Sequence, residues 1–210
     1  MLPANLLSGD GLTEYAAVTA DITAKQAAGY DVTIVDPYGR LLSYQLLQGD
    51  DGGVATRLSG LATLSNFTSY NVPYPIITAL GVNASQGQCG PTVNATQYEL
   101  HPYEYGSWDK GVSAFAQSKY MGSNLTNGVA TKPGVCTVHY DNLGYVFGTS
   151  SDIFPGFCAA IPPTNATTDL GPVLEGIVAK AHTTGEMDLY GVYPNPFYQY
   201  PRSKPSQERH

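Results

Sequence analysis

The sequence is poor in charged residues, and most of the charges that it has are negative. Only 13% of its 210 residues are Asp, Glu, Lys or Arg, and the formal net charge is −7. A nucleic-acid-binding face needs clustered basic residues, so nucleic acid is not expected as a partner. Charge this sparse, in a chain with 16 tyrosines, also argues against a disordered acidic chain.

Long apolar runs and clustered metal ligands are absent as well. No apolar stretch is long enough to span a membrane, so no transmembrane segment is expected. A zinc site needs several closely spaced Cys and His ligands. The four histidines are instead scattered, so no metal and no cofactor are predicted: His101, His139, His182 and His210.

Cysteines are few and odd in number: Cys89, Cys136 and Cys158, with no Cys-X-X-Cys spacing. In a secreted chain, an odd cysteine indicates either a pairing partner elsewhere or a free thiol. The pairing of these three cannot be deduced from their spacing.

The beginning of the chain, Met1-Leu-Pro-Ala-Asn5, lacks the basic and apolar regions of a signal peptide. Five Asn-X-Ser/Thr sequons nevertheless predict N-glycosylation and a secretory route. Together with the odd cysteine, they favour an internal piece of a secreted or cell-surface protein. The predicted glycosylation sites are Asn66, Asn83, Asn94, Asn124 and Asn165.

Apolar periodicity and turn residues predict alternating helices and strands. A helix is expected from Leu12 to Ala28. A second helix is expected to start at Asp36-Pro37, with Asp36 as N-cap, and to stop before Gly49. Pro75–Val82 is typical of a buried central strand, and Gln97–Leu100 of the next strand.

The second half of the chain is less regular. Polar loops are expected over Asn83–Asn94 and Gly122–Pro133. Leu143–Phe147 is predicted to be another buried strand, and Leu189–Tyr193 a final one. A helix is expected from residue 169 or 171 to 181. Residues 194–210 are predicted to form an irregular tail.

One aromatic stretch, Tyr98–Tyr120, organises the middle of the chain. A strand ends at His101-Pro102, and Tyr103, Tyr105 and Trp108 then follow within six residues. Each of these rings can bury a large area while keeping a polar tip. Two interpretations stay open, a packed corner of the core or one wall of an apolar ligand pocket.

This stretch resembles the secreted fungal lysophospholipases, also called phospholipase B, whose catalytic domain is similar to that of the group IV cytosolic phospholipases. The resemblance is clearest in Glu99-Leu-His-Pro-Tyr-Glu-Tyr-Gly-Ser-Trp-Asp109 and in Ser118-Lys-Tyr-Met-Gly-Ser-Asn-Leu-Thr-Asn-Gly128, and it covers most of the chain. It implies an α/β fold in which residues 1–210 form an incomplete, internal piece of a three-layer catalytic domain. Five further blocks carry it: Asp36–Tyr44, Asn71–Ile77, Tyr140–Gly144, Gly148–Ser151 and Tyr193–Phe197.

The resemblance also implies a mechanism, a Ser-Asp dyad without histidine. In the family, the serine sits in a Gly-Leu-Ser-Gly-Gly turn that aims backbone N–H groups at the developing oxyanion. The aspartate lies in an Asp-Gly-Gly segment and acts as general base. In the family's order, the serine turn would precede residue 1 and the aspartate would follow His210. No catalytic residue is therefore predicted within this chain.

Three places copy the letters of these motifs. Ser59 in Arg57-Leu-Ser-Gly-Leu61 and Ser8 in Leu6-Leu-Ser-Gly-Asp10 both lack the outer glycines that the tight turn needs. Asp51-Gly52-Gly53 follows a predicted helix and precedes the blocks after which the family's aspartate comes. Turn chemistry accounts for all three.

The first functional hypothesis is a segment of a lysophospholipase that acts on phospholipid or lysophospholipid at a membrane or micelle surface. A catalytically inactive secreted binding or structural glycoprotein is the alternative, and a truncated gene product is the third. The sequence does not indicate which acyl chain or headgroup would be preferred.

Overall fold

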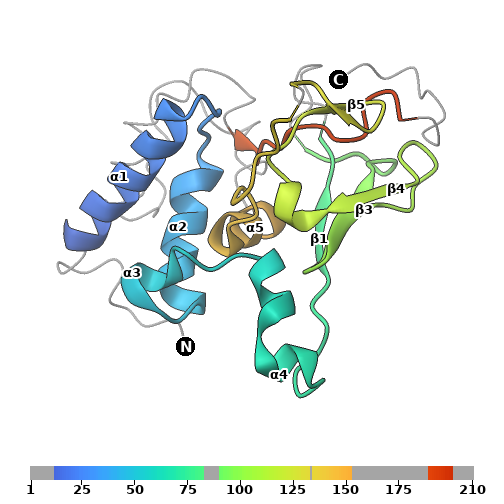
Figure 1. The fold of residues 1–210 in the computed structure, drawn as a ribbon. Coiled ribbons are helices and arrows are strands. Elements are labelled where there is room, and N and C mark those ends of the chain that lie inside the picture. The colour runs from blue at the N-terminus through green and yellow to red at the C-terminus, as the bar shows by residue number, and fades with distance from the viewer. Residues whose placement is uncertain (1–11, 83–89, 133, 153–188, 201–210) are drawn as a thin grey trace.

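The computed structural model describes residues 12–82, 90–132, 134–152 and 189–200 (Figure 1). It combines helices with an antiparallel sheet, which confirms the mixed α/β class. The helices are α1 (Leu12–Ala27), α2 (Val35–Leu46), α3 (Asp50–Gly53), α4 (Ser65–Thr68) and α5 (Leu143–Ser150), with 3₁₀ turns η2 (Ser59–Thr63) and η4 (Ser118–Tyr120). The strands are β1 (Ile77–Leu80), β2 (Gln97–Leu100), β3 (Glu104–Ser107), β4 (Ala114–Gln117), β5 (Leu125–Thr126) and β6 (Val129–Ala130).

The larger sheet is an antiparallel meander with strand order β1-β2-β3-β4. Its register places Ile77, Leu100, Tyr105 and Ala116 in one row across the four strands. This row faces the core, where it packs with Leu58, Met121, Leu143 and Val146. Helices α1, α2 and α5 lie together on one side of the sheet in Figure 1.

Strand β1 corrects the prediction of a buried central strand at Pro75–Val82. It is one of the two edge strands of this sheet, its residues alternate between half-buried and exposed, and Leu80 is 53% exposed. An antiparallel edge strand buries only one face, because successive side chains point to opposite sides. The prediction of a strand at Gln97–Leu100 is confirmed.

The prediction of a strand at Leu143–Phe147 is wrong, because this segment forms helix α5. Its N-cap is Asn142, whose side-chain oxygen accepts a hydrogen bond from the Tyr145 N–H at 3.1 Å. The amide nitrogen of Asn142 donates to the Val54 carbonyl at 2.7 Å, which ties the start of α5 to the preceding chain. Capping thus fixes where the helix begins.

Helices α2 and α5 cross with their backbones in direct contact, and three glycines make this possible. A Cβ added at Gly39 would lie 2.6 Å from the Gly144 carbonyl oxygen, and one at Gly144 would lie 2.7 Å from the Gly39 carbonyl oxygen. A Cβ at Gly148 would meet the Gly39 Cα at 2.8 Å. Any larger residue at these positions would force the two helices apart.

The predicted first helix is confirmed, but the predicted start of the second is wrong. Helix α2 begins at Val35 with Ile34 as N-cap, and no side chain caps it. Asp36 lies inside the first turn, where its carboxylate accepts a hydrogen bond from the Thr33 N–H at 2.9 Å. The same carboxylate also binds Lys25 of α1, so a contact between helices decides its position.

The polar segment Gly122–Pro133 contains a small hairpin, β5–β6, in place of a plain loop. Its two-residue turn has positive φ at Asn127 (54°) and Gly128 (74°), as a type I′ turn requires. The prediction of a strand at Leu189–Tyr193 is wrong, because the chain from 191 to 195 forms neither helix nor strand. Residues 194–200 are irregular, as expected.

Several predictions fall outside the described residues. They are most of the Asn83–Asn94 loop, the helix ending at residue 181, Ser8, Cys89, Cys158, and the tail after residue 200. Cys136 is described, and it is an exposed free thiol.

Candidate functional site

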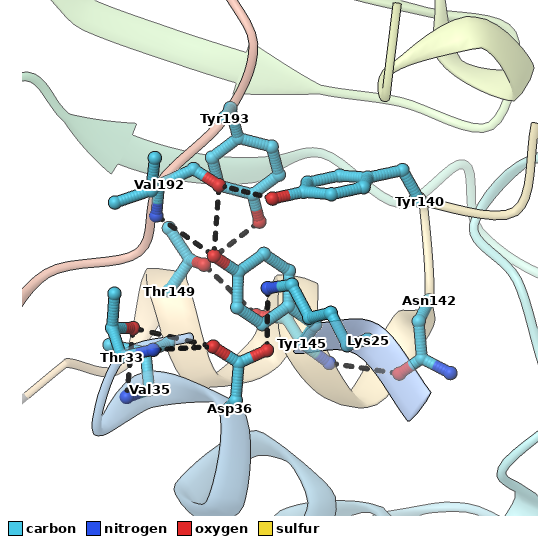
Figure 2. Close-up of polar contacts among 10 residues, drawn as sticks. All are labelled: Lys25, Thr33, Val35, Asp36, Tyr140, Asn142, Tyr145, Thr149, Val192 and Tyr193. Carbon is cyan, nitrogen blue, oxygen red and sulfur yellow. Dashed lines mark hydrogen bonds and ion pairs between the residues drawn. The ribbon is translucent and has the colours of Figure 1, made fainter. Parts of the chain in front are cut away.

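A largely buried ion pair joins α1 to α2 (Figure 2). The Lys25 Nζ lies 2.6 Å from the Asp36 Oδ1, and the side chains are only 18% and 8% exposed. The second carboxylate oxygen, Oδ2, is held by the Thr33 N–H. The pair therefore joins the first helix to the block that begins at Asp36.

Three tyrosines lie around this pair: Tyr140 and Tyr193 from two other blocks, and Tyr145 from α5 (Figure 2). The hydroxyls of Tyr140 and Tyr145 both donate to the Val192 carbonyl, at 2.7 and 3.0 Å. The Val192 N–H returns a hydrogen bond to the Tyr145 oxygen at 2.8 Å. The Tyr193 hydroxyl lies 2.8 Å from the Thr149 hydroxyl of α5. These contacts anchor the segment Tyr193–Phe197, which is remote in sequence, against α5.

The charges of the pair are held in an aromatic environment. The Lys25 Nζ lies 4.1 Å from the centroid of the Tyr145 ring and 5.1 Å from that of Tyr140, so both rings stabilise the ammonium. Burial lowers the pKa of Lys25 and raises the pKa of Asp36, while their mutual attraction opposes both shifts. Burial also raises the pKa of Tyr140, Tyr145 and Tyr193. These hydroxyls therefore act as neutral hydrogen-bond donors.

A cavity of about 310 Å³ opens beside the pair, between α1 and residues 137–145. Its lining includes Lys25, Asp36, Arg40, His139 and Tyr140. No serine or cysteine is among the described residues that line it, and the hydroxyl groups in this lining belong to Thr137 and to tyrosines. The arrangement positions chain segments and could hold a polar group.

Asp51, which copies the family's aspartate motif, is engaged by a buried arginine. The Arg40 Nη2 lies 2.7 Å from the Asp51 Oδ2, and the Tyr44 hydroxyl donates to the Asp51 Oδ1. The Tyr44 hydrogen bond, helped by the charge of Arg40, holds the pKa of Asp51 below its ordinary value. A carboxylate stabilised in this way is a weak general base.

The geometry of the turn explains why a glycine follows Asp51. Gly52 has φ 62°, and a Cβ there would lie 2.4 Å from the Tyr44 ring. The backbone conformation and the Tyr44 ring are therefore sufficient to require a glycine at this position.

Ser59, which copies the family's serine motif, begins the short turn η2. Its backbone N–H donates to the Asp141 Oδ2 at 2.8 Å, so this buried carboxylate contacts the serine backbone and not its hydroxyl in the described contacts. The residue follows buried Leu58 and no strand leads into it. This geometry differs from the strand-to-helix turn that exposes a nucleophilic serine.

The structure separates the three aromatic side chains of the predicted corner. Tyr105 is buried in the core and its ring lies 5.9 Å from that of Phe197, so the packed interpretation holds for this residue. Trp108 and Tyr103 are 74% and 56% exposed, so that interpretation is wrong for them. Within this predicted corner, Glu104–Ser107 forms strand β3.

Three of the predicted glycosylation sites lie in the described residues. Asn66, Asn94 and Asn124 are all exposed, whereas Asn83 and Asn165 lie outside the described part of the chain. An attached glycan must face solvent, so these three positions are compatible with modification.

Sequence reasoning missed Lys25 and the tyrosine cluster. Lys25 lies in the last turn of a helix, where a basic residue is common and points to no particular partner. A usable signal was the tyrosine content of the blocks at Tyr140–Gly144 and Tyr193–Phe197. The hydroxyl of a buried tyrosine usually finds a hydrogen-bond partner, as those of Tyr140 and Tyr145 do here.

In the described residues, no group of three or more His, Cys, Asp or Glu side chains could hold a metal ion. None of the helices in that part of the chain is both long and apolar enough to cross a membrane.

Comparison with known proteins now identifies the family. The chain matches the lysophospholipase catalytic domain family over residues 1–209, and it belongs to this family. It is 34% identical over 186 residues to lysophospholipase 2 of Aspergillus fumigatus, covering 89% of this chain and 31% of that protein. It is 35% identical over 191 residues to lysophospholipase 1 of Candida albicans, covering 89% and 30%. The chain thus spans about a third of the length of these relatives.

Among solved structures, human GIVD cytosolic phospholipase A2 has a similar fold. The TM-score is 0.54 at 20% sequence identity, over 71% of this chain and 18% of that one. At this identity, the similarity concerns the fold alone.

Proposed function

We propose that this chain contributes to the catalytic domain of a lysophospholipase, a carboxylic ester hydrolase that releases fatty acids from (lyso)glycerophospholipids. The observation that carries the proposal is the family match over residues 1–209. The named relatives support it, because they are called lysophospholipases and are 34% and 35% identical to the chain over 89% of its length.

In this proposal, the chemistry proceeds through an acyl-serine, and the Ser-Asp dyad is not formed by residues 1–210. Two observations support this. Asp51 is held ionised by Arg40 and Tyr44, and the backbone of Ser59 is bound by Asp141. The role of the chain is then to build the scaffold in which the dyad works, with Tyr193–Phe197 anchored against α5.

The test is an esterase assay of the 210-residue chain beside any longer natural product that contains it. The chain alone is expected to release no fatty acid from lysophosphatidylcholine above the blank, and a product that carries the dyad is expected to be active. Lysophospholipase 2 of Aspergillus fumigatus serves as the positive control. If the chain alone turned over substrate and lost this activity in Ser59→Ala or Ser8→Ala, the assignment of the dyad would be wrong.

We also infer that the protein is secreted or cell-surface and carries N-glycans. The exposure of Asn66, Asn94 and Asn124 supports this. Expression in a fungal secretory host is expected to give a product whose mass falls on treatment with an N-glycosidase. An unchanged mass would contradict the inference.

A further inference from the structure

The outer face of the sheet, on the side away from the core, carries a cluster of aromatic rings. The cross-strand row next to the buried one consists of Thr78, Glu99, Gly106 and Phe115. Because Gly106 has no side chain, the Phe115 ring lies across it, and a Cβ there would meet the Phe115 Cδ1 at 2.9 Å. The missing side chain brings this ring toward the middle of the sheet.

The rings around Phe115 form one continuous series, which we call the aromatic surface. The Trp108 ring centroid lies 4.8 Å from that of Phe115, and the His101 centroid lies 6.3 Å from it. Tyr74 continues the series, with its ring 5.5 Å from His101 and 6.3 Å from Tyr103. The surface is thus Tyr74, His101, Tyr103, Trp108 and Phe115.

The tryptophan and the two tyrosines of the aromatic surface are exposed to solvent, whereas the His101 side chain is only 13% exposed. Trp108 is 74% exposed, Tyr103 56% and Tyr74 45%. Exposed tyrosine and tryptophan clusters of this kind mark binding surfaces, because one part of each ring is apolar and the other polar. Tyr74 lies in the chain that runs from α4 up into β1 in Figure 1.

Carboxylates lie within this aromatic surface. The Glu99 Oε2 accepts a hydrogen bond from the Trp108 Nε1 at 3.2 Å and lies 3.2 Å from the His101 Nε2. A second carboxylate, Glu104, acts on Tyr74: burial and then the negative charge of Glu104 raise the pKa of that tyrosine. The basic residue nearest in sequence to Trp108 is Lys110, and acidic Asp109 stands between them.

Ring faces and carboxylates together create a negative potential, which selects a cation with an apolar surface. A quaternary ammonium group fits this description, since its methyl groups contact rings while its charge attracts both the π-systems and the carboxylates. Anionic lipids fit poorly, because the chain carries a formal charge of −7. Choline-type headgroups present such a cation at the outermost layer of a lipid surface.

We propose that the aromatic surface is a docking site for quaternary-ammonium headgroups, by which the protein binds phosphatidylcholine-rich membranes. The proposal rests on the proposed function for its choice of a lipid partner. Its test measures binding without hydrolysis, so a failure to bind and a failure to hydrolyse are separate results.

The chain contains its own reporter, because Trp108 is its only tryptophan. Fluorescence of the full chain is measured while vesicles of dioleoylphosphatidylcholine are added, and in parallel vesicles of dioleoylphosphatidylglycerol. The phosphatidylcholine vesicles are expected to shift the emission to the blue and to bind at least fivefold more strongly. Competition by millimolar phosphocholine, which has the same cation without a lipid surface, is expected to reverse the shift.

Two variants keep the fluorophore and change the site. Glu99→Gln preserves the side-chain shape and removes only the negative charge. It is expected to weaken phosphatidylcholine binding about threefold to fivefold. Tyr74→Ala, outside the strands, is expected to weaken it by a similar factor. Tyr198→Ala removes an exposed tyrosine from another segment and is the matched control, which is expected to bind like the wild type.

The proposal is overturned if both vesicle types bind equally, or if Glu99→Gln binds like the wild type, because simple apolar adhesion would then suffice. It is also overturned if no vesicle binds while the chain forms dimers that Tyr103→Ala abolishes in sedimentation experiments. That result would make the aromatic surface an interface between copies of the chain.

Discussion

Replacing Asp36 with asparagine is expected to destabilise the fold by about 3–5 kcal/mol at pH 7, since it leaves the buried Lys25 ammonium without its counter-ion. Asparagine keeps the shape of the side chain and can still accept the hydrogen bond from the Thr33 N–H. The effect is therefore electrostatic. Lys25 can escape by releasing its proton, which for a lysine of ordinary pKa 10.5 costs about 5 kcal/mol at pH 7. This cost sets the upper limit of the loss.

The pH dependence of this variant follows from the same proton. In the variant, burial without a counter-ion lowers the pKa of Lys25 in the folded state below its value in the unfolded chain. Between these two pKa values, the unfolded chain binds more protons, so stability rises with pH. Urea unfolding is measured at several pH values from 7 to 9.5. The difference in the free energy of unfolding between the wild type and Asp36→Asn is expected to become smaller as the pH rises. A gap that widened over this range would contradict a buried, charged Lys25.

Two further variants separate the ion pair from general damage. The double variant Lys25→Met with Asp36→Leu removes both buried charges. Its free energy of unfolding is expected to be much closer to that of the wild type than the value for Asp36→Asn is. Lys110→Met removes an exposed lysine and is expected to change stability by less than about 0.5 kcal/mol. If the double variant were as unstable as Asp36→Asn, packing and not charge would explain the loss.

The sequence predicted those helices and strands whose local residue preferences agree with the packing around them. Helix α1 has apolar periodicity and Gly29 just beyond its end, and both survive in the structure. The segment Leu143–Phe147 gave the opposite result, because Tyr, Val and Phe favour strands and glycine disfavours helices. Contact with α2 reverses this preference, since only glycines allow the two helices to approach so closely.

The candidate site was predictable in part only. The blocks at Asp36–Tyr44, Tyr140–Gly144 and Tyr193–Phe197 were identified from the sequence, and the structure brings them together around Tyr145. Their partner Lys25 lies on another helix, where no local pattern links it to Asp36. The exposure of Trp108 was likewise unpredictable, because it depends on which face of the sheet the core covers.

Substituting alanine for Gly39 is expected to be the second strongly destabilising change, with a loss of about 2 kcal/mol. In an exposed helix, this substitution would stabilise by about 1 kcal/mol through helix propensity. Here the new methyl group would lie 2.6 Å from the Gly144 carbonyl oxygen and 3.0 Å from the Tyr145 Cα, so α2 and α5 must separate. Overpacking of this kind costs about 1–3 kcal/mol, and more where backbone atoms are involved. Thermal unfolding followed by circular dichroism is expected to show Tm lower by about 4–8 °C.

The matched variants test whether the crossing of α2 and α5 causes this loss. Gly148→Ala places a methyl group in the same helix crossing but on α5, since its Cβ would lie 2.8 Å from the Gly39 Cα. This variant is expected to destabilise the fold to a similar extent. Gly60→Ala lies in η2, where the nearest atom would be the Arg57 Cβ at an ordinary 3.7 Å, so its Tm is expected to stay within about 2 °C of the wild type. The double variant Gly39→Ala with Gly148→Ala is expected to lose less stability than the two single variants lose in sum. The reason is that the first methyl group already separates the helices and so leaves room for the second. Fully additive losses would mean that the two glycines act at independent contacts, contrary to the close crossing that the structure describes.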